Sequence, residues 1–263
     1  MKLGLEGKSI MVAAASRGLG NGIARAVAED GARVSIAAPT EPKVHEAAAA
    51  LREETGAEVI SSSFDARDPE SIQAWRDRTV EAFGTVDGLV VNAGGPPPGQ
   101  FDDFDDDDWQ AAFELTLMSS VRMIRTVLPA MRAQGCGSIL TVTSSSIKEP
   151  IDILLLSNVM RSGVVSLAKS LSQQLAPEKI RVNNLVPGSI DTDRLRSNIT
   201  VQSKAAGISF EEKWAQRSAA IPWGRFGNVD EFGRAGAFLL SDAASYITGQ
   251  TLVVDGGMMK TVW

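Results

Sequence analysis

Seven short apolar runs, separated by longer stretches with helical periodicity, constrain the fold of this chain most strongly. Their length and their β-branched residues are typical of strands that are buried on both faces of a parallel sheet. Strands that alternate with helices in this way predict a doubly wound α/β sheet with helices on both faces. The runs are Ile10–Ala15, Val34–Ala38, Val59–Phe64, Gly88–Val91, Ile139–Val142, Val182–Val186 and Thr251–Val254.

No linker or shift in composition divides the 263 residues. We therefore expect one domain spanning residues 1–263, since single α/β domains often reach this size. The segment Asp191–Pro222 is the least periodic and carries Phe210, Trp214 and, just beyond it, Trp223. An insertion of this length late in an α/β sheet predicts a substrate loop or lid over about 191–222.

Composition excludes several classes of protein. The net charge of −6 and pI of about 5.0 argue against a basic nucleic-acid-binding surface. Cys136 is the only cysteine, which excludes an internal disulfide and fits a reducing compartment. No apolar run approaches the roughly 20 residues of a membrane span, and Met1–Ser9 has no long apolar region typical of a signal peptide. We expect a soluble cytoplasmic protein that contacts neither nucleic acid nor membrane.

We also expect no metal. The single His45 leaves no histidine-rich cluster. The acidic run of Asp102, Asp103 and Asp105–Asp108 precedes a helix that begins near Trp109, where carboxylates interact favourably with the helix dipole. A metal site would instead need ligands that converge in space.

The first apolar run leads into a glycine-bearing turn and then a helix through Asp30. The turn reads Ala13-Ala14-Ala15-Ser16-Arg17-Gly18-Leu19-Gly20. Such a turn lets backbone N–H groups and the positive helix end meet a phosphate. Close helix–strand packing would also explain the two glycines, so the assignment depends on other segments.

Five later segments, given at the end of this paragraph, follow the turn with the order and spacing of the motifs of a known family. With them, the chain resembles the short-chain dehydrogenase/reductase family, and most closely its 3-oxoacyl-acyl-carrier-protein reductase-like branch. The resemblance covers essentially the whole chain. It implies a Rossmann-type sheet in the order 3-2-1-4-5-6-7, interconversion of a small-molecule carbonyl and an alcohol with NAD(P)(H), and a homotetramer. The segments are Asn92-Ala93-Gly94-Gly95, Gly137–Ser144, Val186–Thr192, Ile247–Thr251 and Asp255-Gly256-Gly257.

The resemblance also implies a cofactor and its contacts. Ala37-Ala38-Pro39-Thr40, after the second run, lacks the acid that would bind a ribose 2′-hydroxyl. Arg17 resembles a basic residue of NADP-using relatives and Lys43 is a second candidate cation, although a solvated surface arginine is equally consistent. We expect NADP(H). The implied contacts are Ala14, Ser16, Arg17, Gly18, Leu19 and Gly20 in the turn, Asp65 and Ala66 at the adenine, Asn92, Ala93, Gly94 and Arg161 at ribose, Pro187 and Gly188, and Ile190 and Thr192 at the carboxamide.

Ala14 departs from the family pattern, which usually has glycine there. Alanine is acceptable if its φ stays negative, because a left-handed alanine costs roughly 1–2 kcal/mol.

The expected reaction centre departs further. The family's serine is retained as Ser144, and its neighbours Ser145 and Ser146 leave a one-residue slip open. Its tyrosine, lysine and asparagine positions hold Ser157, Arg161 and Thr116. In the family the tyrosine gives a proton to the carbonyl, the lysine lowers the tyrosine pKa and holds the ribose, and the asparagine keeps a water relay.

These changes alter the chemistry. A serine hydroxyl is shorter than a phenol and far less acidic, since a phenol has a pKa of about 10. Arginine stays protonated and relays no proton, but it is suited to clamp a ribose or a carboxylate or to stabilise an alkoxide. The proton would then come from water, Lys148 or Glu149. The alternative for Ser157 and Arg161 is a helix start with a serine cap and a surface arginine.

Two functions are therefore open. One is an oxidoreductase with an atypical site, and the other is a catalytically inactive dinucleotide-binding protein acting as a sensor or assembly subunit. A non-redox reaction in the same pocket is a third possibility.

Overall fold

The computed structural model describes residues 3–262. All seven strands form one parallel sheet in the order β3-β2-β1-β4-β5-β6-β7. The predicted Rossmann-type fold is thus confirmed, and every predicted run coincides with a strand. The strands are β1 (Ser9–Ala13), β2 (Arg33–Ala38), β3 (Val59–Ser63), β4 (Gly88–Val91), β5 (Gly137–Val142), β6 (Ile180–Pro187) and β7 (Thr251–Val254).

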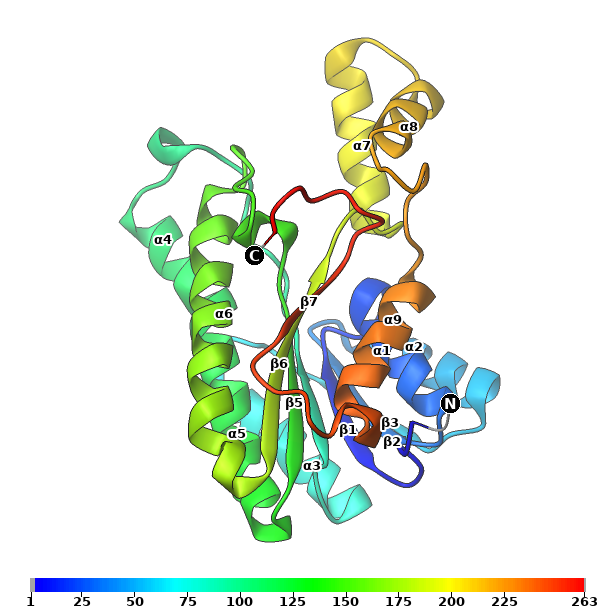
Figure 1. Ribbon diagram of the computed structural model, residues 1–263, viewed down its shortest axis with the longest axis vertical. Helices are drawn as coiled ribbons and strands as arrows, with labels where there is room; N and C mark the ends of the chain where they lie inside the picture. Colours follow the sequence, from blue (N-terminus) through cyan, green and yellow to red (C-terminus); the bar gives the residue numbers. More distant parts are fainter. Residues whose placement is uncertain (1–2, 263) are drawn as a thin grey trace.

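Helices cover both faces of the sheet (Figure 1). One face packs against α1 (Gly18–Glu29), α2 (Glu41–Thr55) and α9 (Val229–Leu240). The other packs against α3 (Pro69–Phe83), α5 (Ser119–Gln134) and α6 (Leu155–Leu175). Each layer has its own apolar core, with Phe232 in the first and Trp75 in the second fully buried.

The acidic run forms helix caps. Asp105 accepts a hydrogen bond from the Asp108 backbone N–H (3.0 Å), and Asp108 accepts one in return from Asp105 N–H (3.2 Å). This capping box begins α4 (Asp106–Ala112), which continues through a π-helical turn at Phe113–Met118 into α5. The carboxylates are thereby engaged at a helix N-terminus.

Helices α1 and α9 cross with their backbones in close contact. A Cβ atom placed on Gly233 would lie 2.1 Å from the Gly22 carbonyl oxygen, and one placed on Gly22 would lie 2.4 Å from the Val229 carbonyl oxygen. Only glycine fits at this crossing. The contact positions the start of α1, and with it the glycine-bearing turn.

The segment 191–222 consists mainly of two helices, α7 (Asp193–Ala206) and α8 (Phe210–Ala219), which project beyond the sheet (Figure 1). Their sequence lacks clear periodicity because α7 buries only Ile199 and Ser203, and α8 fully buries no residue. They pack mainly on each other. Trp214 contacts Phe210 and Phe226, with ring centroids 5.5 and 4.4 Å apart.

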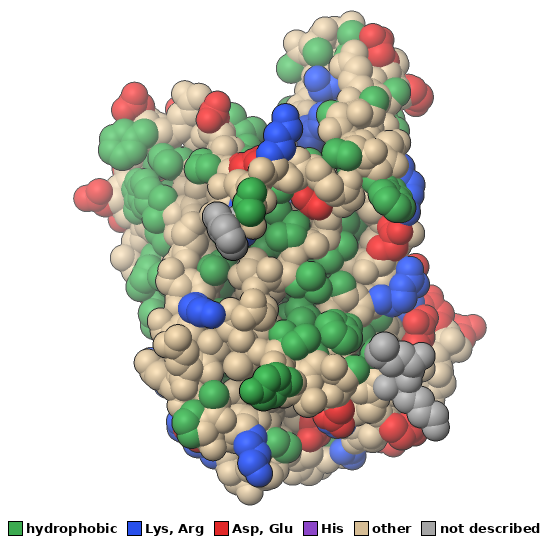
Figure 2. Space-filling model, in the orientation of Figure 1, with side chains coloured by type: hydrophobic (Ala, Val, Ile, Leu, Met, Phe, Trp, Pro, Cys, Tyr) green, Lys and Arg blue, Asp and Glu red, His purple; other side chains and the backbone are tan. Residues whose placement is uncertain are grey.

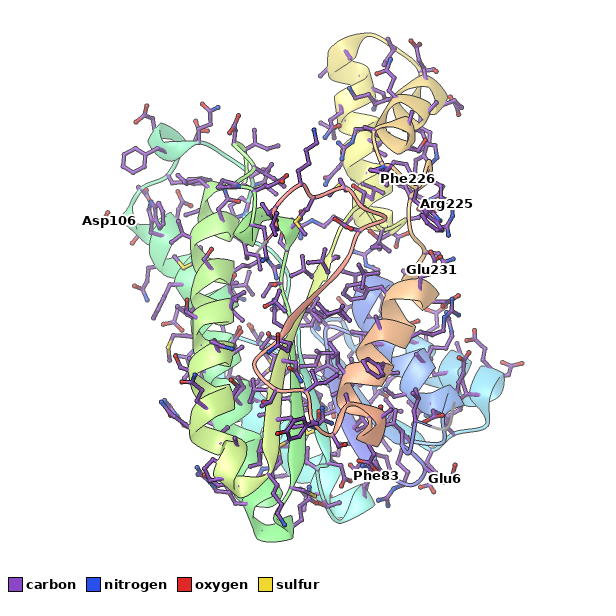
Figure 3. The ribbon with its side chains drawn as sticks, in the orientation of Figure 1. Glu6, Phe83, Asp106, Arg225, Phe226 and Glu231 are labelled. Carbon is purple, nitrogen blue, oxygen red and sulfur yellow. The ribbon has the colours of Figure 1, made fainter. Side chains whose placement is uncertain are left out.

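The base of this helical pair is anchored to α9. Arg225 donates to both carboxylate oxygens of Glu231, at 2.9 and 2.6 Å, beside Phe226 (Figure 3). Glu231 also closes a capping box with Asn228 at the start of α9. The two helices are thus connected to the sheet layer through a defined polar joint. Within residues 3–262, no helix combines the length and the apolar character that crossing a bilayer requires.

Candidate active site

The candidate site lies at the carboxyl ends of the strands. Strand order reverses between β1 and β4, and in open α/β sheets ligands bind at such a switch point. Figure 2 shows the molecule notched between the end carrying α4 and the projecting α7–α8 pair. Asp106 lies on one side of this opening and Phe226 on the other (Figure 3).

The glycine-bearing turn has the geometry of a phosphate cradle. Gly18 has φ +61°, and a Cβ atom on Gly20 would lie 2.6 Å from the Ala14 carbonyl oxygen. Asn21 donates to the Ala15 carbonyl (3.1 Å) and holds the turn against the helix. The turn therefore requires both glycines for steric reasons.

The start of α1 fits an anion. Its N-cap residue, Arg17, makes no side-chain capping bond, and the first turn holds no acidic residue. The N-cap side chain thus satisfies none of the first N–H groups, and the first turn itself does not neutralise the positive helix end. A dinucleotide pyrophosphate fits this position.

Ala14 adopts the unfavourable backbone conformation. Its φ is +51°, so the condition under which alanine would be harmless is not met. The residue is strained in the left-handed region, where a side chain costs roughly 1–2 kcal/mol. The fold nevertheless retains the turn, because the surrounding backbone contacts impose it.

We expect Ala14→Gly to raise the free energy of unfolding by up to about 1 kcal/mol, because relief of the strain exceeds the added entropy of the unfolded chain. The same change should tighten NADPH binding, measured by fluorescence titration. Lys179→Gly is the matched control, since Lys179 also has positive φ, +58°, but lies at the opposite end of the sheet, just before β6. It should stabilise the protein and leave NADPH affinity unchanged. Loss of stability in Ala14→Gly would contradict the assignment of strain.

The other predicted contact segments include those that lie at the carboxyl ends of β4 and β6. Asn92, Ala93 and Gly94 follow β4 directly. Ile190 is buried, and Thr192 caps α7 by accepting from Leu195 N–H (3.3 Å). The Thr192 methyl group lies 3.8 Å from the Cβ position of Gly18, so the exit of β6 and the phosphate turn face each other.

Arg161 connects α6 to the end of β5. Its Nε donates to Ser157 Oγ (3.2 Å) and its Nη1 donates to the Val142 carbonyl (3.1 Å). Ser157 is buried and caps no helix, since α6 begins after Leu154 without a side-chain cap. The alternative of a capping serine beside a free surface arginine is therefore wrong.

The third nitrogen of Arg161 has no partner among the described residues. Within residues 3–262, Nη2 has no hydrogen-bond acceptor, and it is not among the buried polar atoms without a partner. Burial of the side chain, with a smaller contribution from the positive charge of Arg194, lowers the pKa of Arg161 to about 10. The guanidinium thus remains cationic at neutral pH and keeps Nη2 free to donate.

Ser144 and Thr116 lie at turns that pack against α6. Ser144 Oγ accepts from Ser146 N–H (3.2 Å), which leaves its own hydroxyl hydrogen free to donate. Thr116 lies in the π-helical turn, buried, with no partner for Oγ1 among the described residues. The adjoining Leu117 packs 3.1 Å from the Cβ position of Gly163 on α6. The contacts of these turns with α6, and their places in the chain, thus put Ser144 and Thr116 in one region around α6 and the end of β5.

The charged residues expected at the adenosine end form ion pairs. Arg17 is exposed and donates to Asp193 (3.1 Å). Asp65 accepts from Arg67 Nε (3.1 Å) and Nη2 (2.9 Å), and these hydrogen bonds lower the pKa of Asp65. A groove beside the phosphate turn is lined by Ser16, Arg17, Gly18, Asn21, Lys43, Glu46, Ala47, Ala50, Asp191, Thr192, Asp193 and Val229.

Sequence reasoning did not identify Arg194. This residue of α7 places its guanidinium at the loop after β4, with Nη1 2.8 Å from the Cβ position of Gly95. No local motif marks it, because the contact joins segments about a hundred residues apart. Glu149, a candidate proton source, accepts from the Lys260 backbone N–H (2.9 Å).

Comparison with known proteins agrees with this architecture. The family model described as enoyl-(acyl carrier protein) reductase matches residues 13–259. The 3-oxoacyl-[acyl-carrier-protein] reductase of Salmonella typhimurium is 34% identical over 258 residues, covering 97% of this chain and 99% of that protein. The chain belongs to the short-chain dehydrogenase/reductase family, which confirms the prediction of an NAD(P)-dependent oxidoreductase at the level of class.

Two solved structures show similar architecture. L-sorbose reductase from Gluconobacter frateurii, complexed with NADPH and L-sorbose, superposes with a TM-score of 0.95 at 31% identity, over 100% of both chains. NAD⁺-bound xylitol dehydrogenase superposes with a TM-score of 0.88 at 25% identity, over 96% of this chain and 99% of that one.

Proposed function

We propose that this protein reduces a small carbonyl compound to a secondary alcohol with NADPH, using the retained Ser144 together with Ser157 and Arg161, which occupy the family's tyrosine and lysine positions. The observation that carries the proposal is the anchored guanidinium of Arg161, with its free Nη2, beside the end of β5 where Ser144 lies.

The residues supply complementary parts of this reaction. The nicotinamide, when bound, supplies a hydride to the carbonyl carbon. Ser144 donates its hydroxyl hydrogen to the carbonyl oxygen, and Arg161 Nη2 stabilises the negative charge that develops there. Ser157 accepts from Arg161 Nε and positions the guanidinium. The carbonyl oxygen takes its proton from water, because arginine releases none at neutral pH.

Binding of NADP(H) is supported by three features. The end of β2, Ala37-Ala38-Pro39-Thr40, offers no carboxylate that would repel a 2′-phosphate. Arg17 and Lys43 line the groove beside the phosphate turn. L-sorbose reductase, similar over the whole chain, was solved with NADPH.

The double variant Arg17→Ala/Lys43→Ala tests this assignment. We expect NADPH affinity to fall about tenfold, or about 1.4 kcal/mol, because two cations near a 2′-phosphate are lost. NADH affinity should change little. The measurement is fluorescence titration with NADPH and with NADH. An equal loss of affinity for both cofactors would show that the two cations do not bind the 2′-phosphate.

The function itself is tested by turnover. NADPH consumption is followed with β-ketoesters, simple ketones, quinones, keto-sugars and oxo acids. Reduction of any of these at a rate that depends on Ser144 and Arg161 supports the proposal. Tight NADPH binding without turnover on any of them would support the inactive dinucleotide-binding alternative, which the loss of the family tyrosine favours.

We also propose a homotetramer. Phe101, Ile153 and Val159 are 71%, 50% and 48% exposed, and they belong to the neighbouring segments around α4 and α6. Large apolar side chains that are exposed close together on one side of the molecule favour an interface that another subunit covers. Light scattering of the purified protein measures the oligomeric state directly.

A further inference from the structure

Two arginine side chains lie at the carboxyl ends of the paired strands β4 and β5. Arg161 reaches the end of β5 from α6, and Arg194 reaches from α7 to Gly95 in the loop after β4. The positive charge of Arg194 contributes to the lowered pKa of Arg161, so the two guanidinium groups lie within electrostatic reach of each other. Within residues 3–262, neither forms a salt bridge.

The carboxylates that flank Arg194 in the chain are already engaged. Asp191 binds Arg196 through two hydrogen bonds of 2.7 and 2.6 Å. Asp193 binds Arg17 at 3.1 Å. The chain thus neutralises the neighbouring arginines and leaves Arg194 and Arg161 without a counter-charge. Lys and Arg side chains lie on the α7–α8 side of the notch (Figure 2). Two adjacent cations, one of them partly desolvated, favour an anion between them.

The phosphates of the cofactor have a separate place to bind. The uncapped start of α1 offers them free N–H groups at the end of β1. Arg161 lies instead at the end of β5, next to Ser144, where the carbonyl of the substrate would be held. Arg161 is therefore on the substrate side of the site, and Arg194 approaches from the loop after the neighbouring strand β4.

We propose that Arg194 and Arg161 together make this site specific for a small 2- or 3-oxo acid, an inference that rests on the proposed function. Among the described residues nothing occupies the fork of donors of Arg194, which binds the carboxylate in a bidentate manner. Arg161 has two nitrogens engaged by Ser157 and Val142, and its remaining Nη2 contacts the carbonyl oxygen. The carboxylate selects the substrate, and the carbonyl beside it reacts.

Matched acids and esters test this specificity. The pairs are pyruvate with methyl pyruvate and 3-oxobutanoate with methyl 3-oxobutanoate, assayed with the wild-type protein, Arg194→Gln and the control Arg78→Gln. Arg78 is an exposed arginine of α3, remote from the site. The wild type should prefer the acid of at least one pair by about tenfold or more in kcat/KM. Arg194→Gln should abolish this preference by raising KM for the acid, with the ester kinetics and NADPH affinity unchanged, and Arg78→Gln should retain it.

Three results would overturn the inference. The first is equal kcat/KM for acid and ester in the wild type. The second is an equal loss of kcat/KM for acid and ester in Arg194→Gln. The third is weakened NADPH binding in Arg194→Gln with the acid preference intact. The last would assign Arg194 to the cofactor.

A binding measurement separates this inference from the proposed function. Calorimetry measures the affinity of each acid and ester for the NADP⁺-saturated protein without requiring turnover. Binding that needs the carboxylate and is lost in Arg194→Gln, with no turnover of any substrate, supports the anion site and rejects the reductase. Turnover without a carboxylate preference supports the reductase and rejects the anion site.

Discussion

Replacement of Arg161 by alanine is expected to lower kcat/KM for carbonyl reduction by about 10²–10³-fold, the loss typical when one donor to a developing oxyanion is removed. The physical reason is that Arg161 holds a cation and a free N–H donor next to Ser144, fixed by its bonds to Ser157 and Val142. Steady-state kinetics with the best substrate of the panel measures the effect, and thermal unfolding shows whether the variant remains folded. Unchanged kcat/KM would remove Arg161 from the mechanism.

Two companion variants separate charge from geometry. Arg161→Lys keeps the positive charge, but a single ammonium cannot reproduce the planar fork that joins Ser157 to Val142. Its activity should lie between those of the wild type and Arg161→Ala. Ser157→Ala removes only the acceptor of Nε, so a smaller loss is expected if Ser157 positions the arginine. A loss as large as that of Arg161→Ala would instead indicate that the Ser157 hydroxyl acts on the substrate directly.

Gly233→Ala is expected to lower the free energy of unfolding by roughly 3 kcal/mol, at the upper end of what overpacking costs. The added Cβ would lie 2.1 Å from the Gly22 carbonyl oxygen and 2.6 Å from the Gly22 carbonyl carbon. These are backbone atoms of α1, so relief requires the two helices to separate. The measurement is urea unfolding at one fixed protein concentration. Weaker NADPH binding should accompany the loss, because α1 carries the phosphate turn.

Gly163→Ala is the matched control for this change. Gly163 also lies within a helix, but its added Cβ would meet the end of the Leu117 side chain at 3.1 Å, and a leucine can adjust. Its stability should stay within about 1 kcal/mol of the wild type, because the better helix propensity of alanine offsets the contact. Equal destabilisation by both variants would show that the α1–α9 crossing has no special role.

The fold follows from local patterns to a large extent. Each strand was predicted from a short apolar run. The start of α3 has a local signal too, since Pro69 begins the helix and Asp68 accepts from Glu70 N–H at 2.9 Å. Such signals are local, since a buried strand or a helix cap depends on neighbouring residues. The two helices of segment 191–222 were harder to predict from the sequence, because α7 and α8 pack on each other and need only a narrow apolar stripe.

The sequence by itself determined the sheet, the glycine-bearing turn, and the positions 144, 157 and 161 at which the reaction centre departs from its family. Only the tertiary structure decided the left-handed φ of Ala14, the reach of Arg161 to the Val142 carbonyl, the pairing of Arg17 with Asp193, and the approach of Arg194 to Gly95. The reason is physical. Periodicity and capping act between residues close in the chain, whereas the partner of a long charged side chain depends on which distant segments the fold brings within a few ångströms.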